Sequence, residues 1–333
     1  MNLAALSTPA LVVETEALAH NLATMAAALP GARCRPHVKA HKTTELARRQ
    51  RGAGHPGFTC ATPREAIGLA RAGLGDDVLI ANEVVDTERL GSLARIADAR
   101  VTIAVDSEAT IAAAADSGIR EVVIDVDVGL PRCGCRPNDA GRLADEARRR
   151  GLEVRGVMGY EGHVVGVEDR ATRVEQTEEC MELLVRAHGD VGGDLVSAGG
   201  TGTYDINTWA TEIQAGSYAL MDTAYGGLDL PFNPALFVSA TVISVQPDWA
   251  VADCGLKSLG MDHGNPAIEG GTVLFCSDEH LTFVPDPEAP MAVGDRVRVR
   301  PAHVDPTIAY HERMQLLTGD EIVDSWEVDL RGW

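Results

Sequence analysis

The chain has 333 residues and carries 29 lysines and arginines against 49 aspartates and glutamates, which gives a formal net charge of −20. Such an acidic chain lacks the clustered cations that neutralise nucleic-acid phosphates, so we expect no nucleic-acid partner. Its 45 % hydrophobic content indicates a folded globular protein. The sequence has no run of 18 apolar residues and no basic N-terminal region followed by an apolar one. We therefore expect neither a membrane span nor a signal peptide.

The basic residues and the cysteines add two observations. Three residues are lysine (Lys39, Lys42 and Lys257), the first two only three apart, whereas 26 are arginine. A GC-rich genome and a salt-adapted surface both explain this bias. Seven scattered cysteines without a CxxC pair are typical of a reducing compartment, and we therefore expect a cytoplasmic protein.

Up to about residue 230, short apolar runs alternate with stretches whose apolar residues recur every three or four positions. The expected strands are residues 11–14, 35–40, 58–61, 77–81, 101–105, 121–128, 152–160 and 194–200, and the first expected helix covers about 16–28. Alternating strands and amphipathic helices predict a parallel sheet with right-handed crossovers. About eight such units predict an α/β fold, a (β/α)8 TIM-type barrel over residues 16–230.

The C-terminal part of the chain has a different pattern. Residues 231–333 contain strand-like runs separated by short turns rich in Gly, Pro and Asp, without helical periodicity. This pattern predicts an antiparallel β domain. We expect residues 1–15 to join that domain as an additional strand.

Lys39 is the first candidate for chemistry. It lies in the strand-like segment 37–40, which predicts a position at the carboxyl end of an early barrel strand, where barrel enzymes place catalytic groups. His37 and Lys39 alternate with Val38 and should share a face. A lysine that is shielded from water and close to the charge of Lys42 loses its proton more easily, as an amine that forms a Schiff base must. An ordinary surface position is the alternative.

Two glycine-rich segments follow later strands. SAGGTGTYD (197–205) offers closely approachable backbone N–H groups and threonine hydroxyls, which fit a single phosphate group. QAGSYALMD (214–222) could complete the same site, because the loops after the last two barrel strands often bind phosphate. The residues that we expect to contact phosphate are Thr201, Gly202, Gly216, Ser217 and Tyr218.

A histidine and a carboxylate lie two positions apart near the C-terminus, in RPAHVDPT (300–307). The preceding residues alternate as in a strand, so His303 and Asp305 are expected on one face. This pair suits Mn²⁺, Mg²⁺ or Zn²⁺ at an open site. A hydrogen-bonded pair at a strand end is the alternative.

Two further segments place polar residues after expected strands. Arg132 follows one strand in DVGLPRCG, and Tyr160 and His163 follow another in GYEGH. Barrels present such loop residues to their ligands. A surface salt bridge for Arg132 and a helix N-terminal position for His163 are the alternatives.

Taken together, the chain resembles the D-threonine aldolase and D-serine dehydratase family. The resemblance extends over nearly the whole chain in matching order, through TPALVVE, RPHVKAHKTTELARRQ, DVDVGLPRCG, GYEGH, SAGGTGTYD, QAGSYALMD, DCGLKSLGMDHGNP and PAHVDPT. Members of this family are pyridoxal 5′-phosphate (PLP) enzymes with an alanine racemase-type barrel followed by a β domain. They commonly form homodimers.

The resemblance implies a role for each candidate residue. Lys39 would form the Schiff base with PLP, and Arg132 and Tyr160 would lie against the cofactor ring. The two glycine-rich segments would bind the cofactor phosphate. His303 and Asp305 would hold a divalent metal, Mn²⁺ in the first place and Mg²⁺ or Zn²⁺ as alternatives.

The resemblance also implies an activity. Aldolase-type members typically have HxD where dehydratase-type members have HxC, and Asp305 follows the first pattern. The expected reaction is retro-aldol cleavage of a β-hydroxy-D-amino acid to glycine and an aldehyde, with His163 or a metal-bound hydroxide as the base. The alternatives are a D-serine or 3-hydroxy-D-aspartate dehydratase, a non-catalytic PLP carrier, and a metal-dependent hydrolase without PLP.

Overall fold

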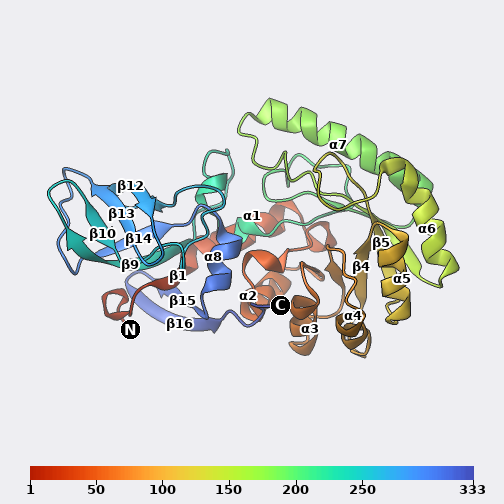
Figure 1. The fold of residues 1–333 in the computed structure, drawn as a ribbon, viewed down its shortest axis with the longest axis horizontal. Helices are drawn as coiled ribbons and strands as arrows, with labels where there is room; N and C mark the ends of the chain where they lie inside the picture. The colour runs from red at the N-terminus through yellow and green to blue at the C-terminus, as the bar shows by residue number, and fades with distance from the viewer. The chain divides into compact units, whose positions relative to one another are not determined.

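The computed structural model describes residues 1–333, and the chain divides into two compact units. The parallel unit comprises Met25–Lys39, Leu46–Gly216 and Gly332–Trp333, and the β unit comprises Met1–Thr24, Ala40–Glu45 and Ser217–Arg331. Figure 1 labels the helices and many of the strands of both units. None of the helices combines the length and the apolar composition that a bilayer span requires.

The parallel unit is built on a seven-stranded parallel sheet in the order β2-β3-β4-β5-β6-β7-β8, of which Figure 1 labels β4 and β5. The strands are β2 Phe58–Cys60, β3 Val78–Ile80, β4 Val101–Val105, β5 Glu121–Asp125, β6 Glu153–Met158, β7 Leu195–Ala198 and β8 Glu212–Ile213. The helices are α3 Pro63–Arg71, α4 Thr87–Ala94, α5 Glu108–Asp116, α6 Ala140–Arg149 and α7 Arg170–Val191. Two further helices, α1 Thr15–Ala28 and α2 Thr44–Gly52, begin in the β unit and continue into the parallel unit.

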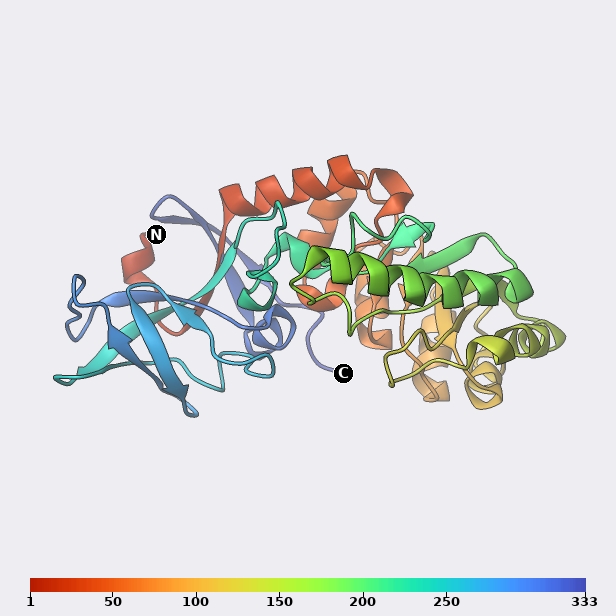
Figure 2. The same ribbon diagram turned by 90° about the horizontal axis from the view of Figure 1, so that it is seen from above.

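Local signals in the sequence explain where several of these helices begin. The Thr62 hydroxyl accepts a hydrogen bond from the Glu65 amide, and Pro63 occupies the first helical position of α3. Ser107 and Thr110 form a reciprocal capping box at the start of α5. Figure 2 shows the long helix α7 beside α6 on the outside of the sheet. The expected alternation of strands and helices is therefore confirmed.

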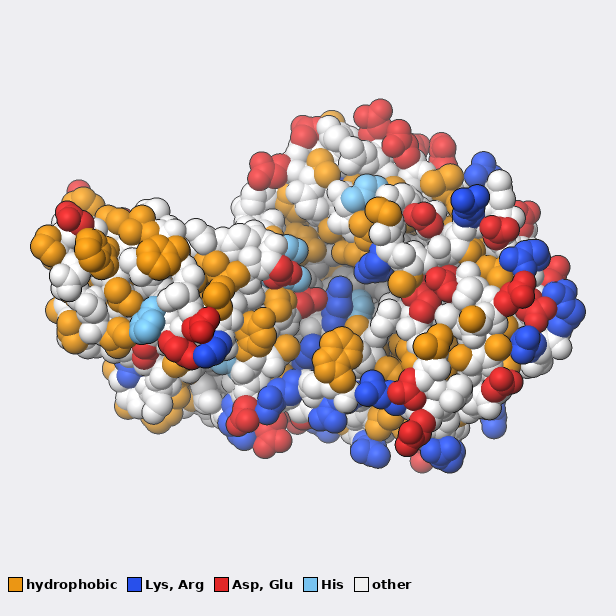
Figure 3. All heavy atoms as spheres, viewed as in Figure 1, with side chains coloured by type: hydrophobic (Ala, Val, Ile, Leu, Met, Phe, Trp, Pro, Cys, Tyr) orange, Lys and Arg blue, Asp and Glu red, His pale blue; other side chains and the backbone are white.

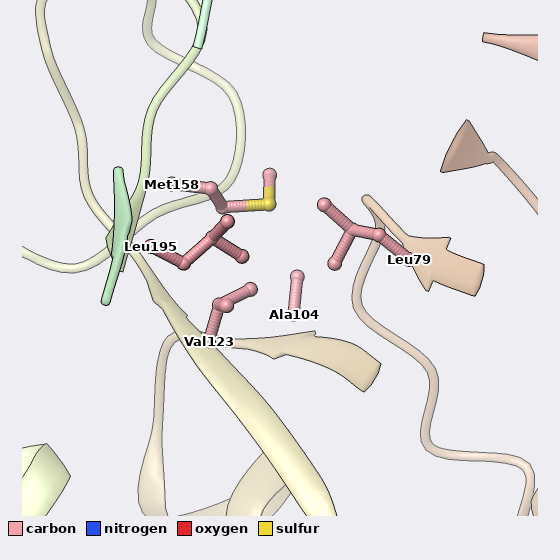
Figure 4. Packing of buried hydrophobic residues seen from close by; sticks show 5 residues of the cluster. All are labelled: Leu79, Ala104, Val123, Met158 and Leu195. Carbon is pink, nitrogen blue, oxygen red and sulfur yellow. The ribbon is translucent and has the colours of Figure 1, made fainter. Parts of the chain in front are cut away.

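An apolar layer fills the inside of the parallel sheet. Figure 4 shows side chains from five consecutive strands pointing toward one another: Leu79, Ala104, Val123, Met158 and Leu195. Each of these side chains is at least nine-tenths buried. Because the helices cover the other face, the strands are buried on both faces, and their sequences are continuous apolar runs.

The full eight-stranded barrel expected from the sequence is not present as eight regular strands; the structure has a curled parallel sheet of seven. Residues 34–37 lie between β8 and β2, because Cys34 forms a bridge with Ile213 and His37 forms one with Thr59. These isolated bridges do not extend into a regular strand. Two features keep this segment short. Pro36 has no amide hydrogen to donate, and the chain turns into a 3₁₀ helix at Val38–Ala40.

The β unit contains a nine-stranded sheet, mostly antiparallel, with the main order β12-β13-β10-β9-β1-β15-β16. The strands are β1 Ala10–Glu14, β9 Leu236–Val245, β10 Ala250–Ala252, β11 Ala267–Ile268, β12 Gly271–Cys276, β13 Leu281–Pro285, β14 Arg296–Arg300, β15 Arg313–Thr318 and β16 Glu321–Glu327. Strand β1 pairs antiparallel with β9 and parallel with β15. Its inner face packs in a small core with Leu6, Phe237 and Leu317.

One prediction for this region is wrong, because the β unit also contains a helix, α8 Val304–Tyr310. The helix is only seven residues long, too short for an apolar period to be recognisable in the sequence. Its first amide, that of Val304, donates to Oδ2 of Asp222 at 2.9 Å. A carboxylate distant in sequence therefore supplies the cap that starts α8.

Charged side chains gather at the amino-terminal edge of the parallel sheet. Nε of Arg35 lies 2.8 Å from both carboxylate oxygens of Glu212, and its Nη2 lies 2.8 Å from Oδ2 of Asp77. Arg155 donates to Oδ1 of Asp77 at 2.8 Å and approaches Glu121 at 3.5 Å. The Arg35 side chain is 5 % exposed. These ion pairs are therefore largely shielded from water and connect several strands.

On the outer surface, in contrast, charged side chains are exposed to water. Figure 3 shows acidic and basic side chains interspersed over the helices of the parallel unit. Exposed pairs such as Arg142–Glu108, at 2.7 Å, belong to this surface. Pairs of this kind contribute little to stability, because water and salt screen them.

We predict that Arg35→Met destabilises the protein by about 3–5 kcal/mol, because it leaves the Glu212 and Asp77 carboxylates without their buried partner. Urea unfolding followed by circular dichroism measures the change. The matched control is Arg142→Met, whose pair with Glu108 is exposed and should lose less than about 1 kcal/mol. Equal small losses in both variants would show that the Arg35 network is unimportant for stability.

The ionised carboxylate of Asp77 should make the stability of the fold sensitive to acid. Burial alone would raise its pKa, but hydrogen bonds from Arg155 and Arg35 outweigh burial and lower the pKa of Asp77 to about 2. A carboxylate with a lowered folded-state pKa stabilises the fold above its ordinary pKa, and this contribution is lost as the pH falls through the folded value. Between pH 4 and pH 2 the wild type should therefore lose more stability than Asp77→Asn. The neighbouring exposed Asp76→Asn should follow the wild type, and parallel curves for all three proteins would contradict this assignment.

Candidate active site

The candidate residues of the parallel unit lie at the carboxyl-terminal edge of its sheet. Lys39 follows the bridging segment 34–37, Arg132 follows β5, Tyr160 follows β6, and the loop 199–203 follows β7. Because all these strands are parallel, their carboxyl ends meet at one edge. The structure therefore places these sequence-predicted residues on the same side of the apolar layer.

Lys39 and Arg132 meet at the ring of Tyr160. Nζ of Lys39 lies 5.8 Å from the ring centroid, and Cζ of Arg132 lies 5.4 Å from it. Both distances are within the range of cation–π attraction. Residues 38–40 form a 3₁₀ helix and not the expected strand, so strand alternation does not orient His37 and Lys39. The backbone amide of Lys39 instead donates to Nδ1 of His37 at 3.4 Å.

The loop 199–203 packs against the segment that follows Tyr160. A side chain at Gly202 would place its Cβ 1.8 Å from the carbonyl oxygen of Val165, so only glycine allows this approach. Thr201 is buried beside it. This close packing explains one of the glycines that the sequence pattern associates with phosphate binding.

Glu161 organises this loop and was missed by sequence reasoning. Its carboxylate is fully buried and accepts hydrogen bonds from the Gly199 amide at 3.1 Å, the Thr203 hydroxyl at 2.9 Å and the Asn207 side-chain amide at 3.1 Å. The signal in the sequence was an acid directly after Tyr160, at the end of an expected strand. An acid in such a position is equally common on a surface, and only the fold shows that it is enclosed.

The second glycine-rich segment passes from one unit into the other. Gly216 ends the parallel unit, and Ser217–Ala219 form a 3₁₀ helix at the start of the β unit. Tyr218 is fully buried there, with its ring centroid 5.6 Å from that of Phe232.

His163 is exposed at the end of the GYEGH segment. Its Nε2 lies 3.7 Å from Sγ of Cys180, and its ring packs against Gly129. Burial raises the pKa of the Cys180 thiol to about 12, so at neutral pH the sulfur is uncharged. The contact between His163 and Cys180 is thus one between an exposed imidazole and a neutral thiol.

His303 and Asp305 lie close together but not, as expected, on one strand. Strand β14 ends at Arg300, His303 is the N-cap of α8, and Asp305 is in its first turn. Nε2 of His303 lies 3.9 Å from Oδ1 of Asp305. Two ligands of one cation at about 2.1 Å each lie about 3–3.4 Å apart, so a small side-chain movement would suffice for both to bind one ion.

Asp222 connects this junction to the segment that follows Tyr218. Its carboxylate accepts from the amide of Tyr225 at 3.3 Å and from that of Val304 at 2.9 Å. Burial raises the pKa of Asp222, although these hydrogen bonds oppose the increase. The position of His303, next to Val304, is thus fixed by a buried side chain.

Two further residues near His303 were missed by sequence reasoning. Oδ2 of Asp262 lies 2.6 Å from Nδ1 of His303, and the ring of His263 stacks on that of His303 with centroids 4.0 Å apart and planes at 8°. Partial burial alone would raise the pKa of Asp262, but the hydrogen bond and charge of His303 lower it. Asp262, His263 and His303 offer ligand atoms within 4.8 Å of one another. The only sequence signal was their place in MDHGNP, a segment that carries the family resemblance.

Comparisons with known proteins identify the relatives of this chain. The family described as "Alanine racemase, N-terminal domain" matches residues 13–223, and the one described as "Putative serine dehydratase domain" matches residues 235–317. A D-threonine aldolase of an Arthrobacter species is 35 % identical, over 99 % of this chain and 94 % of that protein. A 3-hydroxy-D-aspartate aldolase of Paracoccus denitrificans is 32 % identical, over 98 % and 92 %.

Solved structures give the same result. D-threonine aldolase from Filomicrobium marinum matches with a TM-score of 0.93 and 32 % identity, covering 100 % of this chain and 97 % of that one. D-threo-3-hydroxyaspartate dehydratase from Delftia sp. HT23 matches with a TM-score of 0.87 and 26 % identity, covering both chains completely. Fold and sequence thus define an alanine racemase-like protein with a curled parallel sheet and a separate, largely antiparallel unit. Within this class the chain belongs to the family of D-threonine aldolases and their hydroxyaspartate-cleaving relatives, which are carbon–carbon lyases.

We predict that Glu161→Gln destabilises the protein by about 1–3 kcal/mol and loosens the loop 199–203, because an amide cannot accept all the hydrogen bonds that the carboxylate accepts. Urea unfolding measures the stability, and PLP titration followed by absorbance measures the expected weakening of cofactor binding. Glu168→Gln, an exposed acid a few residues later, is the control and should change neither. Unchanged PLP binding in Glu161→Gln would show that Glu161 has no influence on cofactor binding.

Proposed function

We propose that the protein is a PLP- and divalent-metal-dependent lyase that cleaves β-hydroxy-D-amino acids to glycine and an aldehyde, as a D-threonine aldolase does. The observation that carries this proposal is the meeting of Lys39 and Arg132 at the ring of Tyr160. It occurs in a chain that matches D-threonine aldolases from end to end. An amine, a guanidinium and an aromatic face at one sheet edge suit an anionic aromatic aldehyde.

The residues of the parallel unit fit PLP. Nζ of Lys39 is the amine for the cofactor aldehyde, and Arg132 and Tyr160 would hold the ring. The loop 199–203, with Thr201 and Gly202, would bind the phosphate together with Gly216, and Ser217 and Tyr218 would complete this site. Glu161 would keep the loop in its binding geometry through the hydrogen bonds to Gly199 and Thr203.

His303 and Asp305 fit a divalent cation, because an imidazole nitrogen and a carboxylate oxygen are ligands that Mn²⁺, Mg²⁺ and Zn²⁺ accept. We propose Mn²⁺ in the first place. A histidine-to-alanine variant and a cysteine-to-alanine variant of D-threo-3-hydroxyaspartate dehydratase have been solved, the latter in a metal-free form, and the two substituted positions are two apart. We propose that Asp305 takes the part of that cysteine, which favours aldol cleavage here.

The reaction needs an electron sink and a proton acceptor. Bound at these sites, PLP supplies the sink for the electron pair of the breaking Cα–Cβ bond, and the cation lowers the pKa of the substrate's β-hydroxyl. The imidazole of His163, an exposed residue, is the side chain that we propose to accept the hydroxyl proton, with a metal-bound hydroxide as the alternative base. Arg132 and Tyr160 keep the cofactor ring fixed while the bond breaks.

A dehydratase is the second candidate. D-threo-3-hydroxyaspartate dehydratase of a Delftia strain is 28 % identical over 98 % of this chain. The same residues could then support elimination of water, giving ammonia and a 2-oxo acid. The reaction products distinguish the two activities.

Several finer features belong to the same proposal. We propose that residues 34–37 take the place of an eighth strand and close the sheet into a (β/α)8 barrel. Their bridges to β8 on one side and β2 on the other support this proposal. We propose functional boundaries at 1–15, 16–230 and 231–333, supported by the pairing of β1 with β9 and β15. A homodimer and a cytoplasmic location are also proposed, the latter supported by seven free cysteines.

The test is product analysis. We expect the protein loaded with PLP and Mn²⁺ to release glycine and an aldehyde from D-threonine-type substrates and not from their L-enantiomers. His303→Ala and Asp305→Ala should abolish turnover, by at least about 100-fold, but keep the cofactor absorbance, whereas Lys39→Ala should lose that absorbance.

Three outcomes would count against this function. Ammonia and a 2-oxo acid without glycine would identify the dehydratase. Full activity of both His303→Ala and Asp305→Ala would refute the metal site. A protein whose spectrum does not change on addition of PLP would refute the cofactor assignment.

A further inference from the structure

The two ring nitrogens of His303 face different carboxylates. Nδ1 lies 2.6 Å from Oδ2 of Asp262, and Nε2 lies 3.9 Å from Oδ1 of Asp305. An ionised carboxylate can only accept hydrogen bonds, so the contact with Asp262 requires the proton on Nδ1. In a neutral imidazole this leaves the lone pair on Nε2, the nitrogen on the side of Asp305.

The backbone holds Asp262 in this position. Gly260 forms a bridge with His303, and its amide donates to the Thr307 hydroxyl at 2.9 Å. That hydroxyl in turn donates to the carbonyl oxygen of His303 at 2.7 Å. A Cβ at Gly260 would lie 2.3 Å from Cγ of Pro306, so a larger residue could not make this approach. The segment that carries Asp262 is therefore fixed to the junction that carries His303.

The stacking of His263 on His303 fixes the plane of the ring without taking either nitrogen. His263 could itself join Asp262 and His303 as a ligand of a cation. However, Nδ1 of His303 and Oδ2 of Asp262 lie 2.6 Å apart, which is a hydrogen-bond distance and shorter than the roughly 3 Å between two ligands of one cation. The geometry therefore favours a supporting role for Asp262 and His263.

We propose that Asp262 is a positioning residue that holds the Nδ1–H of His303, so that Nε2 is the atom presented to the divalent cation. This inference rests on the proposed function, which assigns the cation to His303 and Asp305. Carboxylates that orient metal-binding histidines in this way typically change metal affinity by about 10–100-fold. The Asp262 side chain is 54 % exposed, so its replacement should not disturb the core.

The first test is Mn²⁺ binding to the full-length protein, measured by isothermal titration calorimetry. We expect Asp262→Ala to weaken the affinity by about 10–100-fold. Asp262→Asn, which keeps an acceptor oxygen, should weaken it less. The melting temperature should not change in either variant. Asp286→Ala, an exposed acid of the same unit, and His263→Phe, which keeps a stacked ring, should bind like the wild type.

The second test needs no metal. In the metal-free wild type at about pH 8, ¹⁵N-edited NMR should show His303 as the Nδ1–H tautomer, and Asp262→Ala should populate the Nε2–H tautomer. An Nε2–H tautomer in the wild type, or normal Mn²⁺ affinity in Asp262→Ala, would overturn the positioning role alone. A tenfold loss in His263→Phe would make His263 a ligand and overturn it as well. Failure of the wild type to bind Mn²⁺ would instead refute the metal site of the proposed function.

Discussion

The buried guanidinium of Arg35 is the interaction on which the parallel unit depends most. Arg35 lies in the segment between β8 and β2, and it joins Glu212, the first residue of β8, to Asp77, just before β3. Removing such charges from water costs several kcal/mol each, and only complete pairing compensates for this cost. The two carboxylates therefore stabilise the segment that leads to Lys39 in its place between β8 and β2. Ion pairs at one edge of the sheet thus help to position the candidate catalytic amine at the opposite edge.

Between the two edges, the parallel unit is divided into layers with different tasks. Ion pairs occupy the amino-terminal edge, side chains such as Leu79 and Met158 fill the middle (Figure 4), and Lys39, Arg132 and Tyr160 lie at the carboxyl-terminal edge. The apolar layer separates the two polar edges, so the charges that stabilise the fold do not compete with those that would bind a ligand. This separation lets loop sequences at the site change without loss of the fold.

The sequence was sufficient to predict features that depend on local patterns. Strand and helix alternation, and the place of Arg132 and Tyr160 after strands, follow from periodicity and parallel topology, whereas Lys39 follows the bridging segment 34–37 and not a regular strand. What it could not reveal depends on contacts between distant segments. Helix α8 is started by Asp222, 82 positions earlier, which turns the expected strand pair of His303 and Asp305 into a helix junction. Likewise, only the folded chain shows that Asp262 lies against His303 and that Glu161 is enclosed by a glycine-rich loop.

The double contact of Asp222 has a consequence for how the site can change. One carboxylate is bonded both to the amide of Tyr225, seven residues after Tyr218, and to the amide of Val304, next to His303. The carboxylate of Asp222 therefore links the two segments, and a shift of one segment should displace the other. The segment after Tyr218, proposed to complete a phosphate site, and His303, proposed to bind a metal, are therefore coupled through one side chain. A substitution that displaces one of these segments is therefore expected to displace the other as well, unless the carboxylate of Asp222 is also replaced.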